Sequence, residues 1–187
     1  NLMPSLDLTN QFLIAMPSMG DPNFAKTVTY VCMHNKDGAM GIVINRPLEI
    51  DVAEIFAQMK IKKIESSTPQ PVYQGGPVQK DCGFIIHNPA RGWNSTIQVT
   101  SEIAVSTSRD ILEAMGGGAG PTATLVALGY AGWDAGQLEE EMKQNAWLSS
   151  PANMQIIFDT PAQLRWQCAV AAMGVDLSSL SHDVGHA

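Results

Sequence analysis

The sequence predicts a mixed α+β fold in one domain. Strand-like segments outnumber helix-like segments, and several follow one another through hairpin-type turns, whereas a doubly wound parallel sheet would alternate strands with helices. Of the 187 residues, 45% are hydrophobic and 16% are charged, so the chain can bury the core of a single domain. We therefore expect one domain over residues 1–187, with an irregular tail at 176–187.

The N-terminal part is expected to form three strands. Residues 12–16 make a short apolar run, residues 27–33 are rich in β-branched and aromatic types, and a loop over 18–24 separates them. The pair Asp37-Gly38 supplies the positive φ that a tight turn needs, and the apolar run 41–44 follows it. The sequence therefore predicts a hairpin after the first strand.

A helix is expected to begin after Asp51. Asp51 and Glu54 have the spacing of a capping box, and the apolar residues that follow recur at helical spacing. The polar, proline-containing stretch 60–71 predicts an exposed connection. Two pairs of short strands come next in the chain. They cover residues 72–74 and 83–87, around the bend Gly75-Gly76-Pro77, and residues 96–100 and 103–105.

Capping signals place three helices in the remainder of the chain. Their starts are marked by Thr107 with Asp110, Asp134 with Gln137, and Thr160 with Pro161. Glycines at 116 and 174 end the first and the last of these helices. The apolar runs 124–130 and 154–158 predict strands between them. The run Glu139-Glu140-Glu141 is typical of a solvated helix face, with Glu139 paired to Lys143.

Sequence blocks along nearly the whole chain resemble the YqgE/AlgH family of bacterial proteins. They include Gly38-Ala39-Met40-Gly41, Asn45-Arg46-Pro47, Gly75-Gly76-Pro77-Val78, Gly83-Phe84-Ile85-Ile86-His87, Leu128-Gly129-Tyr130-Ala131-Gly132-Trp133 and Gly185-His186-Ala187. The resemblance implies one domain of complex topology, with a branched, partly barrel-like mixed sheet flanked by helices. Family members are named transcriptional regulators, after a link to alginate production, without an established biochemical activity. Cys82 departs from the pattern, since the family usually carries Arg before Gly-Phe.

Cys32 and His34 are the candidate catalytic pair. Side chains at i and i+2 of a strand share a face and lie roughly 7 Å apart, so a thiol and an imidazole could meet around one substrate. A neighbouring histidine favours the thiolate that nucleophilic or redox chemistry requires. The alternative is that Cys32 is a half-buried strand residue and that His34 begins the turn.

A metal site is not favoured by the cysteines and histidines. The three cysteines, Cys32, Cys82 and Cys168, form no CxxC pair, which also argues against a disulfide scaffold. A site made of Cys32, His34, Cys82 and His87 would need ligand spacings that zinc sites do not use. We predict no metal and no cofactor.

Seven further residues are candidates for ligand binding: Asn45, Arg46, Gly75, Gly76, His87, Tyr130 and Trp133. Tyr130 and Trp133 could line a pocket at a strand end, although a helix staple with core aromatics explains them too. The Gly75-Gly76 bend marks a place where another backbone or a ligand comes close. Arg46 could hold a carboxylate or a phosphate, or it could simply be solvated. His87 has a structural alternative.

The charge pattern argues against a nucleic-acid surface. Eleven Lys and Arg face 18 Asp and Glu, which gives a formal net charge of −7, and no basic stripe occurs. The predicted helices are separated by strands, so no helix-turn-helix is expected. No window approaches the roughly 18 apolar residues of a membrane span, and no signal-peptide pattern occurs. We therefore expect a soluble cytoplasmic protein without membrane contact.

Three functional hypotheses follow. The first is a regulator that acts through an unknown protein or small-molecule ligand, without direct nucleic acid binding. The second is a thiol-dependent enzyme or redox protein centred on Cys32 and His34. The third is a direct DNA binder. The sequence names no ligand and no oligomeric state.

Overall fold

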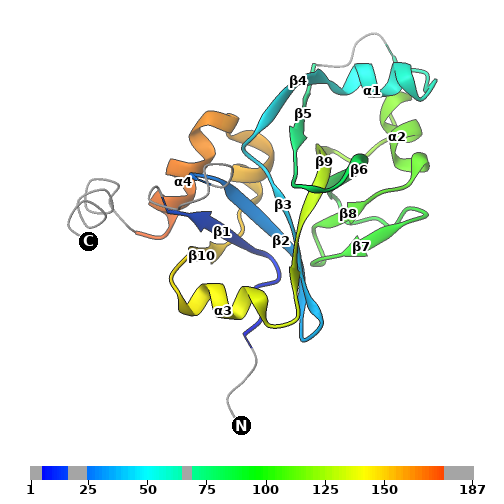
Figure 1. Cartoon of the computed structure of the whole chain (residues 1–187). Helices are drawn as coiled ribbons and strands as arrows, with labels where there is room; N and C mark the ends of the chain where they lie inside the picture. The colour runs from blue at the N-terminus through cyan, green and yellow to red at the C-terminus, as the bar shows by residue number, and fades with distance from the viewer. Residues whose placement is uncertain (1–5, 17–24, 65–68, 175–187) are drawn as a thin grey trace. The chain divides into compact units, whose positions relative to one another are not determined.

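The structure is a computed structural model, and its described residues form two compact units. The described residues are 6–16, 25–64 and 69–174. Unit 1 is drawn from residues 1–41 and 132–187, and unit 2 is residues 42–131 (Figure 1). Both units combine strands with helices, so the α+β class is confirmed. That the whole chain is one domain stays a prediction, and the expected loop and tail lie outside the described residues.

Unit 1 is built on an antiparallel sheet around its first strand. Its strands are β1 (Gln11–Ala15), β2 (Val28–Asn35), the start of β3 (Gly38–Val43), the end of β9 (Ala123–Asp134) and β10 (Trp147–Pro151). β1 pairs with β2 on one side and with β10 on the other, and Phe12 lies opposite both Tyr30 and Ser150. The predicted strands and the hairpin between β2 and β3 are confirmed. β10 was not predicted, because its two serines and its proline break the apolar pattern.

The predicted strand at 154–158 is wrong. Gln155–Asp159 is one turn of π-helix (η1), which a 3-10 turn (η2, Ala162–Leu164) and α4 (Arg165–Ala172) follow. The side chain of Asn153 accepts hydrogen bonds from the backbone N–H groups of Gln155 and Ile156 and so starts the helical turn. A short buried apolar run does not distinguish a strand from a helix, and here the preceding Asn decides.

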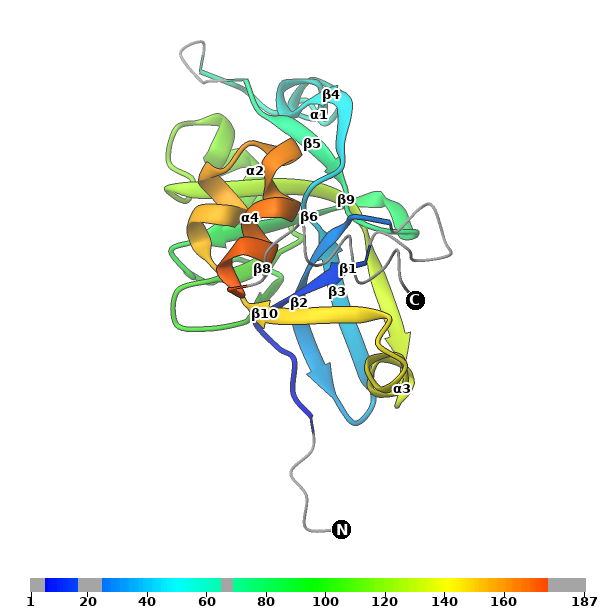
Figure 2. The ribbon, with the colours of Figure 1, turned by 90° about the vertical axis from the view of Figure 1, so that its left-hand side faces the viewer.

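Two helices of unit 1 cover its strands. α4 contacts β1 and β2, with Ala169 and Val170 fully buried, while its Leu164 and Ala171 side stays exposed. α3 (Gln137–Lys143) connects the end of β9 to β10 (Figure 2). The predicted cap on Asp134 is wrong, since Asp134 ends β9 and the N-cap is Gly136, with φ 79°. Half of the expected capping box remains, because the Asp134 N–H donates to Gln137 Oε1 over 3.0 Å.

Unit 2 contains a branched sheet. Its remaining strands are β4 (Pro47–Asp51), β5 (Pro71–Gln74), β6 (Val78–Asn88), β7 (Thr96–Gln98) and β8 (Ala104–Ser106). β9 pairs in parallel with β5 and antiparallel with β6, and β8 and β7 follow β6. The β4–β5 pair lies off this path, which is the branching that the family resemblance implies. β4 was not predicted, because Arg46-Pro47 was expected to end the extended chain there.

The helices of unit 2 close its hydrophobic core against β6 and β9. α1 (Val52–Gln58) has the predicted capping box, in which the Asp51 carboxylate accepts the Ala53 N–H over 2.9 Å. The N-cap position of α2 (Arg109–Gly116) is Ser108, whose side chain makes no capping hydrogen bond, and the predicted cap Thr107 donates its hydroxyl to Ser95 instead. The core consists of Val52, Phe56, Ile61, Val72, Ile85, Ile111, Leu112 and Val126. Ile61 is buried within the stretch that was expected to be exposed.

Candidate functional site

Cys32 and His34 share the buried face of β2, but the imidazole is engaged elsewhere. Nδ1 of His34 accepts the backbone N–H of Leu8 over 2.9 Å, and Nε2 lies 3.3 Å from Oε2 of Glu139 on α3. Because Nδ1 is an acceptor, the ring proton lies on Nε2 and faces the Glu139 carboxylate. The structure therefore links His34 to the N-terminal segment and to α3.

The environment of Cys32 does not favour a thiolate. The side chain is 2% exposed, and its Sγ–H donates to the carbonyl of Met40 over 3.4 Å. Burial raises the pKa of the Cys32 thiol to about 12. A nucleophilic or redox thiol needs a lowered pKa and access to solvent, and Cys32 has neither.

Thiol labelling tests whether Cys32 is unreactive in the folded protein. In the native protein at about pH 8 we expect iodoacetamide to modify the exposed Cys82 first, because its thiol meets solvent, and to leave Cys32 unmodified. Cys32 should become reactive only after unfolding in urea. Peptide mass spectrometry against time gives both rates. Native labelling of Cys32 as fast as Cys82 would restore the thiol-enzyme hypothesis.

Trp133 belongs to a hydrogen-bonded node of unit 1. The indole N–H groups of Trp133 and Trp147 both donate to Oε1 of Glu141, over 3.0 and 2.9 Å, and the rings meet edge to face. Gln137 Nε2 donates to the other carboxylate oxygen over 3.0 Å. Trp133 is therefore a core aromatic residue and does not line a ligand pocket.

The predicted solvated face of α3 is wrong at Glu139 and Glu141, which are half-buried.

The Gly75-Gly76 bend is a close approach of two backbones. A Cβ on Gly75 would lie 2.3 Å from the carbonyl oxygen of Gly129, and a Cβ on Gly76 would lie 2.2 Å from that of Tyr130. The close approach of another backbone, rather than of a ligand, therefore explains both glycines. The Tyr130 ring packs edge to face on Phe84, with centroids 5.3 Å apart. Space at this bend is filled by protein atoms.

His87 is a structural residue of the β6–β8 pair. It is fully buried, its Nδ1 donates to the carbonyl of Pro89 over 2.9 Å, and its Nε2 accepts from the Ser106 hydroxyl over 2.7 Å. Burial lowers the pKa of His87 below its ordinary value of 6.5.

Asn45 and Arg46 are half-buried between β3 and β4, where the Arg46 carbonyl accepts the Gln74 N–H.

The lowered pKa of His87 predicts a pH dependence of stability. Because the unfolded chain binds a proton on this residue more readily, the His87 contribution is fully present above about pH 6.5 and is lost as the pH falls through the folded-state pKa. Urea unfolding at several pH values should therefore show a steeper acid loss in the native protein than in His87→Gln. An equal pH dependence of the free energy of unfolding in the two proteins would contradict a lowered pKa of His87 in the folded state.

One cavity of unit 2 lies between its two helices and its sheet. Its volume is 690 Å³, within the range of about 300–1,000 Å³ that small-molecule sites occupy. α1 contributes Ile55 and is followed by the lining residue Met59, and α2 contributes Arg109 and Leu112. Of the predicted ligand-binding residues of unit 2, none lines this cavity. We call it the α1–α2 cavity.

The floor of the α1–α2 cavity consists of two cross-strand pairs of β6 and β9. Gly83 lies opposite Leu128 and Ile85 lies opposite Val126, so these residues point to one face of the sheet. A Cβ on Gly83 would meet no atom within 4 Å. The space above Gly83 is therefore open.

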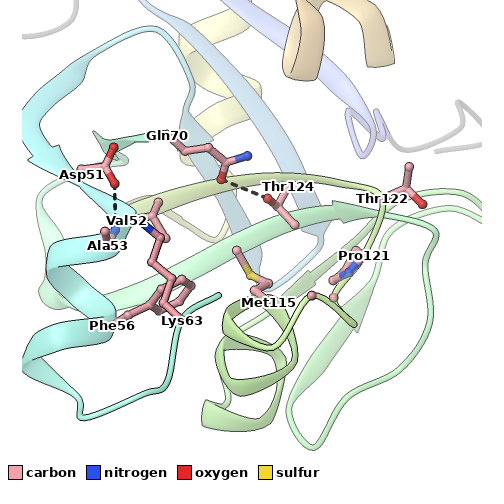
Figure 3. Close-up of a pocket in the computed structure, with 12 residues that line it drawn as sticks. Asp51, Val52, Ala53, Phe56, Lys63, Gln70, Met115, Pro121, Thr122 and Thr124 are labelled. Atoms are coloured by element: carbon pink, nitrogen blue, oxygen red, sulfur yellow. Dashed lines mark hydrogen bonds between the residues drawn. The ribbon is translucent and has the colours of Figure 1, made fainter. Parts of the chain in front are cut away.

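A smaller hollow lies on the other side of α1 and offers less to a ligand. Its volume is 260 Å³, and Phe56 and Met115 reach into it (Figure 3). Some of its polar groups already have partners, since the Thr124 hydroxyl donates to Gln70 and Asp51 caps α1. The α1–α2 cavity is larger and is the better candidate site.

Comparison with known proteins places the chain in a family. A family model described as AlgH-like matches residues 12–178. The chain belongs to the AlgH-like family. A UPF0301 protein of Nitrosococcus oceani is 53% identical over 179 residues, covering 95% of this chain and 96% of the relative. A UPF0301 protein of Thioalkalivibrio sulfidiphilus is 54% identical over 183 residues, covering 98% of each chain.

Solved structures of similar proteins support the AlgH-like fold. The solution structure of AlgH from Pseudomonas aeruginosa matches with a TM-score of 0.78 at 46% identity, covering 97% of this chain and 96% of that one. A crystal structure from Corynebacterium diphtheriae matches with a TM-score of 0.66 at 18% identity, covering 88% and 86%, which shows the fold alone. The family resemblance deduced from the sequence is confirmed.

Sequence reasoning missed the functional groups that the AlgH-like fold brings together. The cavity-lining residues come from five separate elements, β4, α1, β6, α2 and β9, and no local pattern shows that these elements meet. Within residues 6–16, 25–64 and 69–174, no three metal-ligating side chains gather, and no helix is long and apolar enough to cross a membrane.

Proposed function

We propose that this AlgH-like protein acts in transcriptional regulation by binding a small molecule in the α1–α2 cavity, without holding DNA itself. The observation that carries the proposal is the cavity, whose 690 Å³ volume and buried apolar floor are typical of a ligand site. The family resemblance supplies the regulatory role, since proteins of this kind are named transcriptional regulators.

Charge and topology support indirect regulation. The formal net charge is −7, so the chain as a whole repels the phosphate backbone of a duplex. Each of α1, α2 and α3 is followed by a strand, so none of them is the first helix of a helix-turn-helix. A change of ligand occupancy would therefore act through another protein.

Native mass spectrometry of the protein purified from its own host tests the proposal. We expect a retained small mass that denaturation releases, that Gly83→Ala keeps and that Gly83→Leu loses, because leucine fills the space above Gly83. Two results would overturn the proposal. One is a protein without a retained mass, and the other is tight duplex binding at about 150 mM salt with a steep salt dependence.

A further inference from the structure

We propose that the ligand of the α1–α2 cavity is an amphipathic carboxylate, with its apolar chain above Gly83 and its carboxylate held by Lys80 and Arg109. This inference rests on the proposed function and names the chemical class of its ligand. Three features of unit 2 support it. They are an apolar floor that reaches the core, open space above Gly83, and hydrogen-bond donors of Lys80 and Arg109 that are available to a ligand.

The depth of the cavity selects an apolar body. Ile85 and Val126 on the floor are 1% and 2% exposed, and both belong to the hydrophobic core of unit 2. Leu112 of α2 and Met59, the C-cap residue of α1, supply apolar walls. The half-buried side chains of Ile55, Met59 and Leu128 give a ligand hydrocarbon surface to cover, and such burial favours methylene groups over polar ones.

Gly83 gives the apolar body its place. The gap above Gly83 lies between the walls that α1 and α2 form, and no protein atom lies within 4 Å of its Cβ position. The backbone of Gly83 has an ordinary strand conformation paired to Leu128, so neither its φ nor its neighbours require glycine. The space that a side chain at Gly83 would fill is therefore available to a ligand.

The cavity is lined by two cationic side chains, Lys80 and Arg109. Within the described part of the chain the ammonium of Lys80 has no hydrogen bond or ion pair, so its donors are available to a ligand. Arg109 uses only Nε, which donates to Glu113 over 3.1 Å, and its two terminal NH₂ groups remain. Two acidic residues, Glu54 and Asp81, line the same cavity, and Oε2 of Glu54 accepts the Asp51 N–H over 2.8 Å.

The donors of the two cationic side chains favour a single carboxylate on the ligand. A carboxylate accepts from the ammonium of Lys80 and from the guanidinium of Arg109 at once, and such charge-assisted bonds are the stronger kind. Glu54 and Asp81 repel additional negative charge, so a polyanion such as a nucleotide triphosphate is disfavoured. A cationic head would face Lys80 and Arg109 and lose both contacts.

Decanoate is the probe, measured by isothermal titration calorimetry at about 50 mM salt. We expect decanoate to bind at least about tenfold tighter than decanol and decylamine, which keep the chain and change the head. Affinity should rise roughly fourfold per methylene from octanoate to decanoate, because each added methylene is buried. Decanol or decylamine binding as tightly as decanoate would overturn the carboxylate assignment.

Two sets of variants locate the site. Gly83→Leu should weaken decanoate binding at least tenfold, and Gly83→Ala should weaken it far less, because alanine adds one methyl group. The double variant Lys80→Gln with Arg109→Gln should remove the preference of decanoate over decanol, while Lys36→Gln in the β2–β3 turn, the charge control, should keep it. Unchanged affinity in Gly83→Leu, or an unchanged preference in the double variant, would place the ligand elsewhere.

The two proposals fail in different ways. If decanoate does not bind at millimolar concentration while native mass spectrometry shows a retained mass that Gly83→Leu loses, the carboxylate class is wrong and the ligand-binding function stands. If no mass is retained from the host and decanoate does not bind, both proposals are wrong. A retained mass with a titratable carboxyl group supports both.

Discussion

Replacement of Gly129 by alanine is expected to lower the free energy of unfolding by about 3 kcal/mol or more. Gly129 has φ +77°, a left-handed conformation that costs a side-chain-bearing residue about 1–2 kcal/mol. Its added Cβ would also lie 2.3 Å from the carbonyl oxygen of Gly76, and overpacking of this kind costs about 1–3 kcal/mol. The Gly76 oxygen belongs to a backbone that faces the same strand, so it has little freedom to retreat.

Gly83→Ala is the matched control for this experiment. Gly83 pairs with Leu128, the neighbour of Gly129, but its added Cβ would meet nothing within 4 Å. We expect its stability to change by no more than about 1 kcal/mol, in the stabilising direction, because alanine reduces the freedom of the unfolded chain. Urea denaturation followed by tryptophan fluorescence compares the two. A Gly129→Ala midpoint equal to that of Gly83→Ala would refute the close-approach argument.

The elements that the sequence predicted well are those whose signals are local. The capping box of Asp51 and Glu54 forms as expected, because both partners lie within one helical turn. The Asp37-Gly38 pair likewise sits at the β2–β3 turn, where Gly38 has φ 138°. Strand β9 was recognised from its continuous apolar run, although it extends to Asp134.

The candidate site could not be predicted, because its members meet only through pairing of distant strands. Gly83 in the sequence is one glycine in an apolar run, and its role depends on Leu128 opposite and on α1 and α2 above it. The same reason explains the error at Glu139. Its partner is His34, more than a hundred positions earlier in the chain, and a local pattern shows only its spacing to Lys143.

Glu141→Ala is expected to destabilise the protein by about 3 kcal/mol. Trp133 and Trp147 are 8% and 5% exposed, and both donate their indole N–H to one oxygen of Glu141. Removing the carboxylate leaves two buried donors without an acceptor, and each such loss costs about 1–3 kcal/mol. Urea unfolding gives the free energy, and near-ultraviolet circular dichroism reports the change around the two indoles.

Glu140→Ala separates this role from a general effect of charge on α3. Glu140 neighbours Glu141 on the same helix but is exposed, and its carboxylate accepts the Gln144 side-chain amide over 3.4 Å. We expect a change within about 0.5 kcal/mol. Glu141→Gln keeps an oxygen that can accept both indole N–H groups, so it should retain most of the stability that Glu141→Ala loses. Equal losses in Glu140→Ala and Glu141→Ala would mean that the helix, not the indole contacts, sets the effect.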